Sequence, residues 1–260
     1  MRIKLYLIVA LAAVALTYTS CKKSGSGPEN TVSTKQVSQQ IALNLSQTLY
    51  GGLGGFSIFD GINPPSNVNV ARRGRGLKLN DDGVDFGCGA VIDTTLSYST
   101  TLDDGGSASI SGEFKFSVLC ANGTPNGLSF YTKLKVTENT AQIGASYNLG
   151  ENLMITAVDP NNDNSPILLN GSLNVDANVQ QKTGSKATDA ETFDYVFTNV
   201  KVDPSVGDIV SGSATFATKG ATPSGTWNYS GTITFLGNHQ AKIVINGTTY
   251  TVDLQTGTVS

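Results

Sequence analysis

A period-two alternation of apolar and polar residues, running from Gly89 to the end of the chain, constrains the fold more than any other feature. Within 107–120, apolar or small residues at even positions alternate with mainly polar residues at odd positions. Successive side chains of a strand point to opposite faces, so this pattern predicts half-buried strands. The expected strands are 91–102, 107–120, 128–136, 141–149, 153–158, 167–179, 191–202, 209–218, 226–236, 241–246 and 248–254.

Turn residues separate these segments, and the pair Asn246-Gly247 is typical of a two-residue hairpin. No intervening helical stretch is long enough for a crossover between parallel strands, so we expect an antiparallel meander. A glycine recurs at the inward positions of four strands, after a serine in three of them and after Asn170 in the fourth, and indicates bends. The expected fold is all-β: a meander curled into an open barrel or half-barrel, with a two-sheet β-sandwich as the alternative.

One amphipathic helix is expected at 33–50. Ser33 and Gln36 have the spacing of a capping box, and an apolar residue follows at every fourth position from Val37 to Leu49. The apolar stripe needs a surface to cover, and the inner face of the curled sheet provides one. We therefore expect a single β-rich domain over 33–260 with this helix at its start, while 51–87 carries no clear pattern.

The first twenty residues have the composition of an export signal. Basic Arg2 and Lys4 precede an apolar run over 5–16, which is too short to span a bilayer as a helix. Small residues then lead to Cys21. This arrangement resembles the lipobox of bacterial lipoproteins, although Tyr18 stands where a branched aliphatic residue is usual. The resemblance implies cleavage of 1–20, lipidation of Cys21 and a flexible tether over 21–32.

Together with the Gly, Ser and Asn-rich β-domain, this N-terminus is similar to lipoproteins of unassigned function from Bacteroidota. The resemblance implies a membrane attachment through the lipid anchor, at the outer membrane. In that phylum an acidic cluster after the lipidated cysteine marks export to the cell surface, and Lys22-Lys23 stands there instead. We therefore expect the protein to face the periplasm, with the cell surface as the alternative.

Cys88 and Cys120 remain after Cys21 is assigned to lipid. In an oxidising compartment such a pair indicates a disulfide, and two buried thiols are the alternative. The cysteines lack the paired spacings of a metal site, so no metal is expected.

The composition offers little catalytic chemistry. The formal charge of −3 argues against a nucleic-acid partner, and the single histidine, His239, is expected on the surface. Asp81-Asp82 and Asp103-Asp104 are expected in solvated turns. No catalytic residue and no cofactor is predicted, and whether the chain is an enzyme stays open.

Three functions remain after these exclusions: a non-catalytic module that binds an apolar or amphipathic ligand, a structural lipoprotein that binds an envelope protein, and an enzyme acting on glycans. The first is favoured because a curled sheet with an apolar inner face can hold such a ligand. Its ligand-facing candidates are Phe114, Phe116, Phe130, Leu173, Trp227 and Tyr229.

Overall fold

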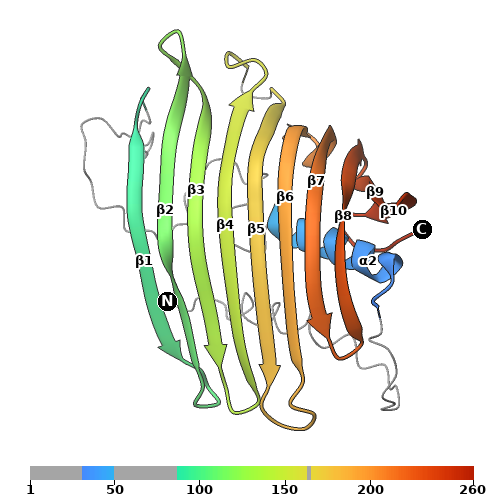
Figure 1. Cartoon of the computed structure of the whole chain (residues 1–260). Helices are drawn as coiled ribbons and strands as arrows, with labels where there is room; N and C mark the ends of the chain where they lie inside the picture. Colours follow the sequence, from blue (N-terminus) through green and yellow to red (C-terminus); the bar gives the residue numbers. More distant parts are fainter. Residues whose placement is uncertain (1–30, 50–86, 163–164) are drawn as a thin grey trace.

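The structure, a computed structural model, describes residues 31–49, 87–162 and 165–260. Figure 1 shows ten strands side by side in chain order, with one helix behind the later strands in that view. Every neighbouring pair is antiparallel, so the sheet is a continuous meander. The first and last strands do not pair with each other, and the sheet is therefore open, as expected for an open barrel or half-barrel.

The described elements follow one another without a crossover. The helix is α2 (Thr34–Leu49) and the strands are β1 (Val91–Thr101), β2 (Ser107–Ala121), β3 (Thr124–Asn139), β4 (Ile143–Ala157), β5 (Ile167–Gln181), β6 (Thr188–Asp203), β7 (Asp208–Thr222), β8 (Gly225–Gly237), β9 (Gln240–Ile245) and β10 (Thr248–Asp253).

The predicted alternation is confirmed by burial along β2. Phe116 and Val118 are buried and Phe114 is half-buried, while Glu113 and Lys115 are exposed. The buried positions of all ten strands share one face, which we call the inner face, and α2 lies on it. The helix and the sheet thus share one hydrophobic core.

Eleven strands were expected and the described part of the chain has ten, because 141–149 and 153–158 form one strand, β4. The sequence Gly150-Glu151-Asn152 looks like a break between them. Instead the ladder continues through it, with Glu151 opposite Thr132 of β3 and Leu173 of β5.

Helix α2 begins as predicted. The Ser33 hydroxyl accepts a hydrogen bond from the Gln36 backbone N–H, and the Gln36 side chain accepts one from the Ser33 N–H, both at 3.3 Å. These reciprocal bonds satisfy two amide groups that the first turn leaves without helical partners. The buried stripe Val37, Ile41 and Leu45 faces the sheet, and β9 and β10 are the strands closest to the helix.

The residues before α2 extend the sheet. Strand β9 pairs only with the second half of β8, from Gly231 onward. Along the first half, Thr31 forms a parallel bridge with Thr226, and the Val32 N–H donates a 3.0 Å hydrogen bond to the Thr226 carbonyl. This pairing fixes where the chain enters the helix.

Two of these inward-facing glycines show why the pattern recurs. Gly171 and Gly212 have φ values of 125° and 118°, which side chains rarely tolerate. A Cβ atom at Gly171 would lie 2.1 Å from the Asn152 carbonyl oxygen, and one at Gly212 would lie 2.4 Å from the Val200 Cα. The neighbouring backbones approach too closely for any other residue, as the predicted bends require.

Candidate functional site

The phenylalanines predicted to face a ligand lie on the inner face. Phe116 and Phe130 are directly opposite each other on β2 and β3, with ring centroids 5.2 Å apart in an edge-to-face arrangement. Phe114 is half-buried in the next inward position of β2. Leu173, on β5, is almost fully buried at 1% exposure. These four side chains belong to one apolar surface.

The two aromatic candidates on β8 are both hydrogen-bonded within the fold, and Tyr229 contacts the segment before α2. The Trp227 indole N–H donates a 3.1 Å hydrogen bond to the Thr218 hydroxyl on β7. The Tyr229 hydroxyl donates a 2.9 Å hydrogen bond to the Val32 carbonyl. Their rings therefore pack on the inner face where the chain approaches α2, and their polar tips are bonded within the fold.

A group of buried and half-buried polar side chains interrupts the apolar inner face. It combines Tyr147 and Glu151 from β4, Glu191 and Tyr195 from β6, and Gln40 from α2. We call these five residues the inner polar cluster. None of the five is among the ligand-facing residues predicted from the sequence. One sequence feature points to Glu151: it has the same parity as Leu149 and Leu153, so it is an acidic residue in a row of apolar, inward-facing ones.

Strand register brings the cluster together. In one row across the sheet, Tyr147 lies opposite Ala177 of β5, which lies opposite Glu191. In a second row, four residues along β4, Glu151 is followed by Leu173 and then by Tyr195. Gln40 approaches from the helix, and its Nε2 donates a 3.3 Å hydrogen bond to Oε1 of Glu191.

Burial changes the acidity of both carboxyls. It raises the pKa of Glu151 from 4.5 to about 7, although a hydrogen bond with the Thr132 side chain partly opposes this. Burial also raises the pKa of Glu191 to about 7, and the negative charge of Asp189 adds to the effect. Removing a carboxylate from water penalises its charged form, so the proton is held to higher pH. The pKa values of Tyr147 and Tyr195 are raised for the same reason.

Three polar atoms of the cluster have no hydrogen-bond partner. They are the hydroxyl oxygens of Tyr147 and Tyr195 and the Oε1 atom of Gln40, and all three are buried. The tyrosines are only 7% and 1% exposed. A buried polar group without a partner costs about 1–3 kcal/mol, so three of them together call for an explanation.

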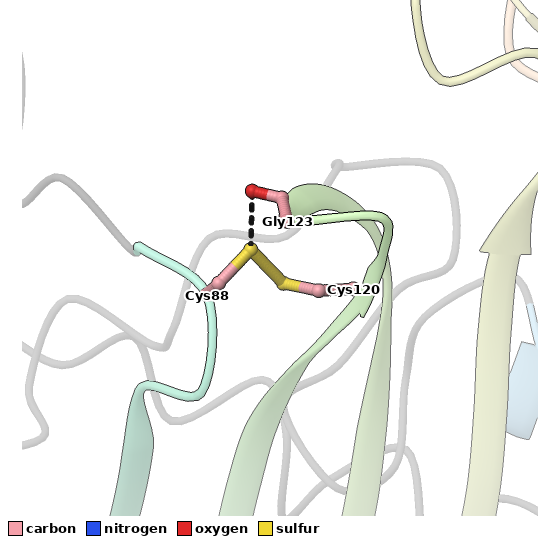
Figure 2. The surroundings of a disulfide bond; sticks show 3 residues. All are labelled: Cys88, Cys120 and Gly123. Atoms are coloured by element: carbon pink, nitrogen blue, oxygen red, sulfur yellow. Dashed lines mark hydrogen bonds between the residues drawn. A yellow bond between two sulfur atoms is a disulfide. The ribbon is translucent and has the colours of Figure 1, made fainter.

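The predicted disulfide between Cys88 and Cys120 is confirmed. Figure 2 shows it joining the segment before β1 to the end of β2, with the Cys88 Sγ 3.0 Å from the Gly123 carbonyl oxygen. The bond lies at one edge of the sheet, away from the inner polar cluster. Cys21, the expected lipidation site, lies outside the described residues.

His239 lies in the turn between β8 and β9 and is partly exposed, but it also contacts the sheet. Its side chain is 28% exposed, and its Nδ1 lies 3.2 Å from Oδ1 of Asp208, a buried residue at the start of β7. The Asp208 carboxylate also accepts a hydrogen bond from the His239 backbone N–H. The pair connects the β8–β9 turn to β7.

The adjacent aspartates singled out in the sequence are not brought into the inner polar cluster where the structure describes them. Asp103 and Asp104 are exposed in the turn between β1 and β2, as expected, and Asp81-Asp82 lies outside the described residues. Within 31–49, 87–162 and 165–260, no three His, Cys, Asp or Glu side chains are grouped to hold a metal ion.

A comparison with protein-family models, curated proteins and solved structures found no match to this chain. None of the described segments forms a helix with the length and apolar content that a membrane crossing needs.

Proposed function

We propose that this protein is an envelope lipoprotein whose sheet binds an amphipathic ligand without catalysing a reaction. In this proposal, lipids on Cys21 hold it at the outer membrane, facing the periplasm. The open sheet supplies an apolar surface, and the inner polar cluster supplies partners for a polar head group. The proposed protein thus has two partners: the membrane, through its lipid anchor, and the amphipathic ligand.

The observation that carries the proposal is the pair of buried, unpartnered hydroxyls of Tyr147 and Tyr195 within an apolar face. Small-molecule sites are mostly apolar surfaces with a few convergent polar groups that orient the ligand. A face used only for packing gains nothing from such groups, because each destabilises the folded state while it is unpaired.

Two other functions receive less support. For a glycan-cleaving enzyme, the candidate pair in the inner polar cluster is Glu151 and Glu191, but they lie two strands and four residues apart. Register thus separates their Cα atoms by about 16 Å, and each carboxyl is hydrogen-bonded to a different neighbour, Thr132 or Gln40. For a protein-binding surface, the exposed Met154 and Val196 are separated by polar neighbours and form no continuous apolar patch.

Ligand binding is tested with a neutral dye that fluoresces in apolar surroundings, such as N-phenyl-1-naphthylamine. We expect saturable binding by the purified protein, and a Phe114→Ser variant should weaken it. Tyr131→Ser is the matched control, because Tyr131 is also half-buried but lies on the opposite face of the neighbouring strand. Absence of saturable dye binding, or an equal loss of dye affinity in the two variants, would contradict the proposal.

The anchor is tested separately by metabolic labelling with a fatty-acid analogue. Wild-type protein should incorporate label and sediment with outer membranes, and Cys21→Ser should do neither. Equal labelling of the two proteins would disprove the lipid anchor without affecting the ligand-binding proposal.

A further inference from the structure

The unpartnered atoms of the inner polar cluster define what a ligand must offer. The Gln40 Oε1 atom only accepts hydrogen bonds, and a tyrosine oxygen also accepts. Oε1 of Glu191, already bonded to the Gln40 amide, is a further acceptor beside them. These acceptors come from α2, β4 and β6, so a group placed among them satisfies them best by donating several hydrogen bonds.

The charges on the inner face have one sign. Glu138, Glu151, Asp189 and Glu191 all occupy inward positions of their strands. In the part of the chain that the structure describes, no arginine or lysine shares that face with them. The strand lysines all lie on the opposite face: Lys115, Lys133, Lys135, Lys201, Lys219 and Lys242.

Aromatic rings lie beside the acceptors. On β6 the ring of Tyr195 is stacked between those of Phe193 and Phe197, with centroid distances of 6.3 Å and 6.1 Å. These neighbours cover both faces of the Tyr195 ring, so its hydroxyl oxygen is the atom left to meet a ligand. Carboxyls and acceptor oxygens together are suited to an ammonium group.

We infer that the inner polar cluster binds the primary ammonium group of a cationic amphiphile, whose alkyl chain lies on the apolar inner face. This inference rests on the proposed ligand-binding function and names its ligand class. An ammonium has three N–H donors, which match Gln40 Oε1 and the two tyrosine oxygens, and its charge balances Glu191. An alcohol has one donor and no charge, and a carboxylate has no donor and the wrong charge.

The inference predicts how binding depends on pH. Burial raises the pKa of Glu191 to about 7 in the free protein, and a bound ammonium favours its ionised form. Alkylammonium binding should therefore strengthen from pH 5 to pH 8. The groups that face this site are Gln40, Tyr147 and Tyr195, with Glu151, Asp189 and Glu138 as the other carboxyls of the same face.

The experiment compares three amphiphiles with the same chain: decylammonium, decanol and decanoate, each below its micelle concentration. Binding to the purified protein is measured by calorimetry and by the fluorescence of Trp227, the single tryptophan. We expect decylammonium to bind roughly tenfold more tightly than decanol, and decanoate to bind most weakly. The decylammonium affinity should increase from pH 5 to pH 8, and the decanol affinity should not.

Variants locate the ammonium. Glu191→Gln should weaken decylammonium binding roughly tenfold and leave decanol binding nearly unchanged. Asp194→Asn is the matched control, because Asp194 is exposed on the opposite face of the same strand. If Glu191→Gln does not fold by circular dichroism, Tyr195→Phe removes one acceptor and should cause a smaller loss, again selective for the ammonium.

The outcomes distinguish this inference from the function beneath it. Decanol or decanoate binding as tightly as decylammonium would overturn the inference and leave the amphiphile-binding function intact. An equal loss of decylammonium affinity in Glu191→Gln and Asp194→Asn would also overturn the inference. Such a result would indicate only a general attraction of the cation to an acidic protein. Binding of none of the three would contradict the proposed function itself.

Discussion

Gln40 of α2 donates a hydrogen bond to the Glu191 carboxyl of β6, across 151 residues of sequence. The bond places a helix side chain inside the inner polar cluster and leaves the other amide atom, Oε1, without a partner. Helix and sheet therefore meet through a polar contact as well as through the apolar stripe of α2.

Stability should decrease as pH rises from 5 to 7.5. In the unfolded chain Glu151 and Glu191 ionise near their ordinary pKa of 4.5, whereas in the folded protein they keep their protons up to about pH 7. Between these values the folded state binds more protons, so raising the pH favours unfolding, by up to about 1.4 kcal/mol per pH unit and group. Thermal melts by circular dichroism should show a falling Tm that levels off above pH 7.5.

Glu151→Gln together with Glu191→Gln should flatten this slope, because glutamine resembles the protonated carboxyl. Glu113→Gln, at an exposed position of β2, should keep the wild-type slope. Asp203 and Asp253, whose pKa values are lowered by hydrogen bonds from Ser205 and from Thr256, act in the opposite direction only below about pH 4. A Tm that rises between pH 5 and 7.5 would contradict the raised pKa values of Glu151 and Glu191 in the folded protein.

Gly220→Ala should destabilise the protein and disturb Trp227. A Cβ atom at Gly220 would lie 2.2 Å from Cζ2 of the Trp227 ring, so the indole would have to move. Overpacking of this kind costs about 1–3 kcal/mol, measurable by urea unfolding, and the Trp227 emission should shift. Gly150→Ala is the control, because the nearest atom to a Cβ there is 3.7 Å away. Equal losses of stability in the two variants would show that the clash with Trp227 does not cause the destabilisation.

Removing the disulfide should lower stability by about 2–4 kcal/mol. The bond links Cys88 to Cys120, which are 32 residues apart, and so restricts the unfolded chain over that loop. The measurement is urea unfolding of Cys88→Ala/Cys120→Ala against the oxidised wild type. The double variant should be insensitive to a reducing agent, whereas the wild type should be destabilised by it. Equal unfolding midpoints for oxidised and reduced wild type would argue against a stabilising bond.

Tyr229→Phe should loosen the entry to α2. It removes the hydrogen bond from the Tyr229 hydroxyl to the Val32 carbonyl, at a cost of about 0.5–1.5 kcal/mol. Hydrogen exchange at the Val32 amide, which donates to Thr226, should become faster. Tyr131→Phe, on the opposite face of β3, should leave that amide unchanged. Unaltered exchange in Tyr229→Phe would mean that this bond does not hold the segment.

The break expected near Gly150 shows why sequence reasoning missed the cluster. Three residues, Gly150 to Asn152, look like a turn because glycine and polar residues end most strands. Pairing on both sides overrides that local preference: Glu151 lies between Thr132 and Leu173 in a continuous ladder. The carboxyl that most distinguishes the inner face was therefore hidden in a predicted loop.

The sequence by itself determined the antiparallel meander, the start of α2 and the face on which Phe114, Phe116 and Phe130 lie. These features depend on side-chain parity, turn residues and capping groups, which act over a few residues. Only the tertiary structure decided that Gln40, Tyr147 and Glu191 meet. Their proximity depends on the strand register from β4 to β6 and on where the helix lies across the sheet. Removal from water at that place, rather than residue type, raises the pKa values of Glu151 and Glu191.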